Sequence, residues 1–155
     1  GPVAGNYLAS LNPKRVAIIH DKQQYGEGIA TAVRDTLKDK GVEIAMFEGI
    51  TAGSKDFSSL VTKLKQADVD YVYYGGYHPE LGLILRQARQ ADLDTTCMGP
   101  EGVGNKGINT IAGEAAEGLL VTLPPAFDQK AANQELIQAF DAYPHRRFVR
   151  AAAAS

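Results

Sequence analysis

The chain has 155 residues, of which 45% are hydrophobic and 22% charged, with a net charge of −2 and a pI near 5.9. This length favours one domain with a sizeable core over two domains. The weak net charge gives no electrostatic basis for binding nucleic acid or an anionic membrane, and no apolar run approaches the roughly 20 residues of a membrane span. The single cysteine, Cys97, excludes an internal disulfide and leaves the compartment open.

Strand-like runs alternate with helical patterns along most of the chain. The opening segment, with Tyr7, Leu8 and Leu11, is expected to form a helix that packs on a sheet. Runs of β-branched or aromatic residues predict strands, whereas apolar residues spaced by three and four predict helices. We expect strands at residues 15–20, 42–47, 70–74, 95–99 and 119–123, and helices at about 26–40, 57–64, 79–90, 108–116 and 133–142.

This regular alternation predicts βαβ units and therefore an α/β fold. The expected architecture is a doubly wound, mostly parallel five-stranded sheet with helices on both faces. We expect a single ligand-binding lobe over residues 1–142, followed by an atypical segment over residues 143–155. No signal peptide is visible at the start of the chain.

The most informative stretch is YYGGYHPE at residues 73–80, where a strand is expected to turn into a helix. Ligands of open α/β sheets bind beyond the carboxyl ends of the strands. The loops after three predicted strands place Tyr25, Tyr77 and Glu101 on one rim. Two rings and a carboxylate suit a ligand with an apolar part and a cationic group, such as an amino acid.

Each of these features also has a plainer interpretation. The corner formed by Gly75 and Gly76 is equally compatible with a packing turn flanked by strand tyrosines. Tyr25 is equally compatible with a residue that packs at the start of a helix. Glu101 lies in a glycine-rich segment, and the simplest interpretation of this residue by itself is a solvated acidic side chain in a loop.

Sequence signatures of enzymes and cofactor sites are weak. The GEG run at residues 26–28 has Thr31 where a dinucleotide fingerprint requires a third glycine, and no phosphate-binding GxxxxGK[ST] loop is present. Cys97 lies within a predicted strand, and the three histidines are not spaced as metal ligands. We therefore expect binding without chemistry, and neither a cofactor nor a metal.

Several motifs together resemble the periplasmic branched-chain amino acid-binding proteins of bacterial ABC importers. These are IIHDKQQYGEG at residues 18–28, YYGGYHPE at 73–80, MGPEGVGN at 98–105, GLLVT at 118–122 and FDQ at 127–129. The resemblance runs from about residue 1 to residue 141. It implies a two-lobed fold that closes on leucine, isoleucine or valine, of which this chain resembles most of the second lobe.

The resemblance also implies roles and partners. Glu101 would pair with the ligand ammonium, Tyr77 would line the cleft beside the ligand, and Tyr25 would close over it. The full-length parent would be periplasmic and would deliver its ligand to the membrane permease of the importer. An isolated lobe is expected to bind weakly, because one wall of the cleft is missing.

The tail and two other hypotheses stand apart from the resemblance. Residues 143–155 do not resemble the family continuation and are interpreted as an engineered or frameshifted end, with a solvated basic run. The alternative function is a doubly wound enzyme domain that binds a nucleotide or flavin. A third hypothesis is homo-oligomerisation through apolar lobe surfaces left exposed.

Overall fold

The computed structural model of the chain describes residues 2–123 and 147–150. Its strands form one parallel sheet in the order β2-β1-β3-β4-β5-β6. The strands are β1 (Arg15–His20), β2 (Glu43–Gly49), β3 (Tyr71–Gly75), β4 (Thr96–Gly99), β5 (Leu120–Leu123) and β6 (Arg147–Arg150). The helices are α1 (Pro2–Ser10), α2 (Gln24–Asp39), α3 (Ser58–Ala67), α4 (His78–Gln90) and α5 (Gly107–Ala112), with 3₁₀ turns η1 (Glu101–Val103) and η2 (Gly113–Ala116).

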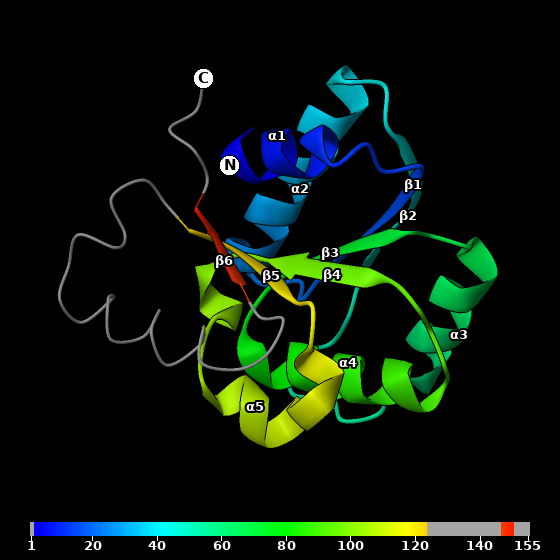
Figure 1. Cartoon of the computed structure of the whole chain (residues 1–155), viewed down its shortest axis with the longest axis vertical. Helices are drawn as coiled ribbons and strands as arrows, with labels where there is room; N and C mark the ends of the chain where they lie inside the picture. Colours follow the sequence, from blue (N-terminus) through cyan, green and yellow to red (C-terminus); the bar gives the residue numbers. More distant parts are fainter. Residues whose placement is uncertain (1, 124–146, 151–155) are drawn as a thin grey trace, which may run out of the picture.

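Helices cover both faces of the sheet, as predicted. Helices α1 and α2 lie on one face, and α3, α4 and α5 lie on the other (Figure 1). The five predicted strands are all present within a residue or two of their expected bounds, and the opening segment is helical. The predicted helix at residues 133–142 and the domain boundary at 142 lie outside the described residues.

The described residues add a sixth strand that was not predicted. Residues 147–150 were expected to belong to a solvated tail, but they form β6, which pairs in parallel with β5. The segment reads RFVR, with only two apolar residues between arginines. This pattern is too short to identify a strand, so β6 is defined by its neighbour β5 and not by its own sequence.

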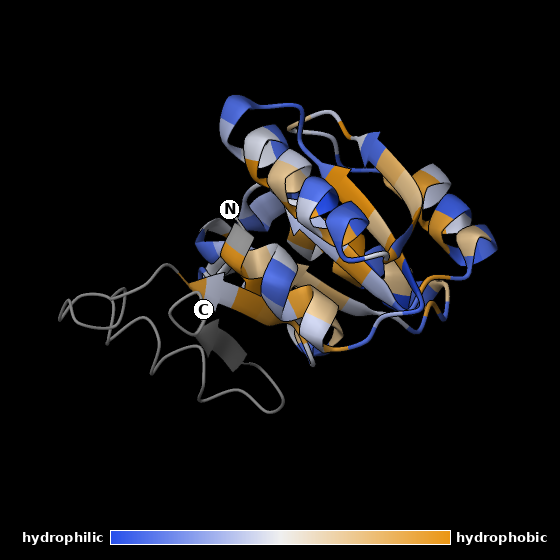
Figure 2. Ribbon diagram, turned by 90° about the horizontal axis from the view of Figure 1, so that it is seen from above, coloured by the Kyte–Doolittle hydropathy of each residue, from blue (hydrophilic) through white to orange (hydrophobic). Residues whose placement is uncertain are grey.

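Two apolar layers hold the fold together, one on each side of the sheet. The alternation of side chains along a strand sends neighbouring residues to opposite faces. Tyr73 packs with Leu8, Val33 and Leu37 under α1 and α2, whereas Tyr74 packs in the layer under α3, α4 and α5. Figure 2 shows hydrophobic residues along the central strands and hydrophilic ones on outer turns of the helices.

Little of the apolar interior reaches the surface. Tyr77, which is 46% exposed, is the only exposed large hydrophobic side chain among the described residues. Homo-oligomerisation through exposed apolar surfaces stays a prediction. No helix in the described ranges is both long and apolar enough to cross a membrane.

Helix α2 approaches the end of β3 with no side chain between the two backbones. A Cβ built on Gly26 would overlap the carbonyl oxygen of Gly75, and a Cβ on Gly75 would overlap that of Gly26. Only glycine permits this approach at both positions. By contrast, Gly28 lies two residues further along α2 with nothing within 4 Å of its Cβ position.

These two glycines make a matched pair for a stability measurement. We expect Gly26→Ala to lower the free energy of unfolding by about 1–3 kcal/mol or more, because the backbones of α2 and β3 must separate. Gly28→Ala should instead raise it by about 0.5–1 kcal/mol, because alanine favours an exposed helical position. Urea unfolding followed by circular dichroism measures both, and equal midpoints for the two variants would contradict this account.

Candidate functional site

The candidate site lies where the strand order reverses. Strand β1 stands between β2 and β3, so the chain leaves β1 toward one side of the sheet and leaves β3 toward the other. In doubly wound sheets this reversal opens a crevice at the carboxyl ends of the strands. The register pairs His20 of β1 with Gly75 of β3, so the loops after both strands begin at the same level.

The structure brings together the three residues that the sequence placed on one rim. Tyr25 lies in the first turn of α2, Tyr77 immediately precedes α4, and Glu101 begins η1 after β4. The rings of Tyr25 and Tyr77 stack with their centroids 5.1 Å apart and their planes at 22°. The Tyr77 ring also lies against Gly102, where a Cβ would be 3.1 Å from its Cδ1 atom. The result is a half-exposed aromatic surface beside a carboxylate.

The Tyr25 hydroxyl is held in its neutral form. Burial raises the pKa of Tyr25, and the nearby Glu101, Tyr77 and Asp21 raise it further, whereas a hydrogen bond with the Gly102 backbone acts in the opposite direction. At neutral pH the phenol of Tyr25 is therefore uncharged, and it lies beside the Tyr77 ring and Glu101. This arrangement suits a ligand with a cationic end and an apolar body.

Gly75 and Gly76 both have a packing role at the end of β3. Gly75 permits the contact with α2, and the Gly76 backbone crosses the ring of Tyr74, whose hydroxyl would be 2.6 Å from a Cβ on Gly76. Pro79 occupies the first turn of α4, and Glu80 accepts a hydrogen bond of 2.9 Å from the Gly53 amide. The corner is thus packed on both sides, and Tyr77 and Pro79 are its exposed residues.

The loop before Tyr25 satisfies three successive amides with three different acceptors. The Asp21 amide donates to the Gly75 carbonyl at 3.1 Å, and the Gln23 amide donates to Oδ1 of Asp21 at 3.0 Å. Between them, the Lys22 amide donates to Nδ1 of His20 at 3.1 Å. Lys22 has φ +65°, a left-handed conformation that costs a non-glycine residue about 1–2 kcal/mol.

Sequence reasoning assigned no positional role to His20 or Asp21. Both are buried, with 5% and 2% of their surface exposed. The available signal was a histidine that ends a buried strand and an aspartate that directly follows it, before a helix that lacks a Ser, Thr, Asp or Asn cap.

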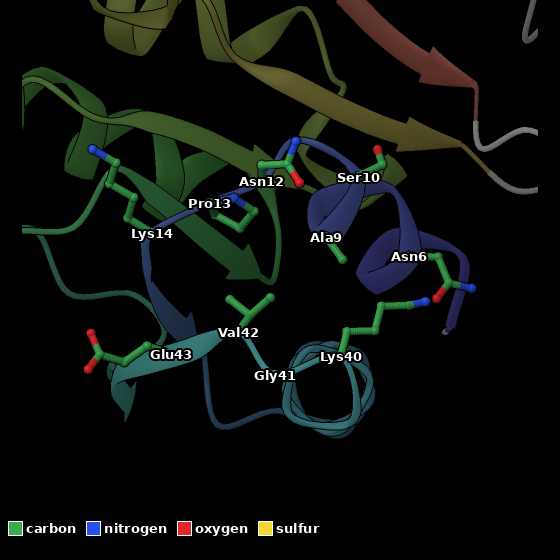
Figure 3. Close-up of a pocket in the computed structure, with 10 residues that line it drawn as sticks. All are labelled: Asn6, Ala9, Ser10, Asn12, Pro13, Lys14, Lys40, Gly41, Val42 and Glu43. Carbon is green, nitrogen blue, oxygen red and sulfur yellow. The ribbon is translucent and has the colours of Figure 1, made fainter.

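A cavity lies at the opposite edge of the sheet. Its volume is about 660 Å³, and the ends of α1 and α2 contribute to it (Figure 3). It is lined by Asn6, Ala9, Ser10, Asn12, Pro13, Lys14, Lys40, Gly41, Val42 and Glu43. It contains no aromatic side chain, and its two lysines are exposed. The described residues contain no cluster of His, Cys, Asp and Glu side chains that could hold a metal.

Comparison with known proteins gives consistent matches. A family model described as "Periplasmic binding protein" matches residues 1–154. The Leucine-, isoleucine-, valine-, threonine-, and alanine-binding protein of Pseudomonas aeruginosa is 59% identical over 143 residues, which are 92% of this chain and 38% of that protein. The Leu/Ile/Val-binding protein of Escherichia coli (strain K12) is 58% identical over 92% of this chain and 39% of its own length. This chain thus spans about two fifths of the relatives it matches.

Solved structures show the same architecture. The branched-chain amino acid transporter substrate binding protein from Streptococcus pneumoniae, in complex with isoleucine, has a TM-score of 0.74 and 29% identity. The match covers 91% of this chain and 41% of that one. A periplasmic binding protein type 1 from Bordetella pertussis has a TM-score of 0.76 at 24% identity and shows the shared fold.

The buried phenols predict a loss of stability in alkali. Burial raises the pKa of Tyr73 and of Tyr74, as it does that of Tyr25. A raised folded-state pKa stabilises the fold below the ordinary phenol pKa of about 10, and this contribution is lost as the pH rises above that value. We expect the free energy of unfolding to fall by up to about 1.4 kcal/mol per pH unit for each such phenol.

Urea unfolding between about pH 9 and 11 measures this slope, which starts at the ordinary phenol pKa. Tyr73→Phe removes one buried phenol and should make the decline shallower. The same slope in that variant would show that Tyr73 ionises equally well in the folded and unfolded states.

Proposed function

Because the chain belongs to the periplasmic binding protein family, we propose that it supplies one lobe of the substrate-binding component of an ABC importer for branched-chain amino acids. The observation that carries this proposal is the stack of Tyr25 on Tyr77 beside Glu101, at the carboxyl edge of the sheet. The names of both relatives include leucine, isoleucine and valine, which agrees with the chemistry of this rim.

The ammonium group and the aliphatic side chain of the amino acid ligand would be recognised by different residues. Glu101 would accept hydrogen bonds from the ligand ammonium, and such charge-assisted bonds are shorter and stronger than neutral ones. The faces of Tyr25 and Tyr77 would cover the aliphatic side chain, which gains about 25 cal/mol for each Å² of apolar surface removed from water. The raised pKa of Tyr25 keeps its phenol uncharged next to that apolar group.

The described lobe forms one wall of the proposed cleft. A second lobe would have to hold the ligand carboxylate and exclude water, as is usual for sites that bury most of a small ligand. We propose that the full-length protein is periplasmic and passes its ligand to the membrane permease. In this scheme the lobe alone binds weakly.

A nucleotide- or flavin-binding enzyme is the less favoured function. Phosphates bind at helix N-termini through free backbone amides. At the start of α2 the Gln23 amide is already bonded to the buried Asp21 carboxylate, whose negative charge would repel a phosphate. The named relatives are binding proteins, and we propose that this chain has no enzymatic activity of its own.

Leucine titration of the chain, followed by the NMR signals of labelled tyrosine rings, tests the proposed site. We expect shifts at Tyr25 and Tyr77 at high leucine concentration, with weak affinity because one wall acts alone. Micromolar or tighter binding by the monomer would contradict the single-wall argument. The absence of any tyrosine shift would contradict the site itself.

The proposed role of Glu101 has a matched control. Glu101→Gln should weaken leucine binding about tenfold or more, because a hydrogen bond to a charged group contributes about 1.5–3 kcal/mol. Glu114→Gln makes the same chemical change at an exposed position on η2 and should leave the affinity unchanged. Equal affinities for the two variants would rule out the ammonium role. In a two-lobed protein that contains this lobe, we expect Glu101→Gln to cause a larger loss of affinity than in the lobe alone.

A further inference from the structure

His20 is a buried histidine that the proposed binding chemistry does not use. It ends β1, five residues before Tyr25, and only 5% of its surface is exposed. Its Nδ1 atom lies 3.1 Å from the Lys22 amide nitrogen, which donates a hydrogen bond to it. A nitrogen that accepts carries no proton, so in a neutral imidazole the proton is on Nε2.

The hydrogen bond lies at the one residue of the loop with a left-handed backbone. Lys22 has φ +65°, and its amide has no other acceptor among the bonds formed by the loop. The neighbouring amides are fixed by Gly75 and by Asp21. The imidazole therefore holds the Lys22 turn, which sets the direction in which the chain enters α2 and brings Tyr25 to the rim.

Packing fixes the imidazole from several elements. Its ring lies 5.2 Å from that of Phe47 on β2, at 47°, and a Cβ on Gly49 would be 2.8 Å from its Cε1 atom. The Lys22 side chain packs over the same glycine. A substitution at Gly49 would displace both, so the close approach of this ring to β2 requires glycine there.

Charged groups lie around His20 on two elements. From α2, Oε1 of Glu27 lies 3.9 Å from Nε2, and the Arg34 guanidinium lies over the Phe47 ring at 4.6 Å from its centroid. From the loop, Asp21 is adjacent in sequence, and the Lys22 amide donates its hydrogen bond to Nδ1. Register partners Gly49 of β2 and Gly75 of β3 contribute no charge.

We propose that neutral His20 is a positioning residue for the candidate site, and that its Nδ1 atom holds the loop that presents Tyr25 to Tyr77. Addition of a proton at Nδ1 replaces the acceptor with a donor that faces the Lys22 N–H. The ordered loop thus requires an Nδ1 atom that carries no proton. The consequence for ligand affinity rests on the proposed function, whereas the positioning of Tyr25 does not.

Two variants of the whole chain separate hydrogen bonding from packing. In His20→Asn the side-chain oxygen replaces Nδ1 as an acceptor that does not titrate, whereas His20→Leu has no acceptor. We expect hydrogen exchange of the Lys22 amide to accelerate about fivefold to tenfold in His20→Leu, the size expected for one hydrogen bond. His20→Asn should restore the protection. Unchanged exchange in His20→Leu would overturn the proposal.

One measurement needs no variant and remains decisive if His20→Leu does not fold. The ¹⁵N spectrum of labelled histidine in the native chain reports which ring nitrogen carries the proton. We expect His20 with its proton on Nε2 alone at neutral pH, and a proton on Nδ1 would overturn the proposal. Failure of leucine to shift the tyrosine signals would contradict the proposed function, and these histidine measurements would still test the positioning role.

Discussion

The contact between Gly26 and Gly75 is the constraint on which the rest of the site depends. Because neither residue has a Cβ, the first turn of α2 lies directly on the end of β3. This approach sets Tyr25 beside the corner that carries Tyr77, and it brings the Asp21 amide to the Gly75 carbonyl. A larger separation of these backbones would leave two isolated phenols in place of one stacked surface.

The site combines buried tyrosines beneath the rim with one half-exposed ring on it. Tyr73 and Tyr74 are buried in the layers beneath the rim, whereas Tyr77 is nearly half exposed. Burial gives the supporting side chains fixed positions, because close packing leaves few alternative rotamers. The Tyr77 ring is not enclosed in this way, and it contacts Tyr25 and Gly102.

Much of the fold and the location of the rim could be predicted from the sequence. The apolar spacing of Val33 and Leu37 identified the buried side of α2, and the common direction of parallel strands was enough to place Tyr25, Tyr77 and Glu101 at one edge. The ring stack and the bond between Lys22 and His20 could not be predicted, because both depend on side-chain distances between separate elements. Strand β6 could not be predicted either, because it is defined by its hydrogen bonds with β5 and not by its own four residues.

The opposite orientation of Tyr73 and Tyr74 limits how β3 can evolve. Each phenol occupies a separate layer of the core, and the next two residues are the glycines that meet α2 and cover the Tyr74 ring. Insertion or deletion of one residue in this strand would exchange the two faces and move the glycines out of register with both contacts. Conservative substitutions preserve this alternation, so sequence divergence at β3 should proceed by replacement and not by change in length.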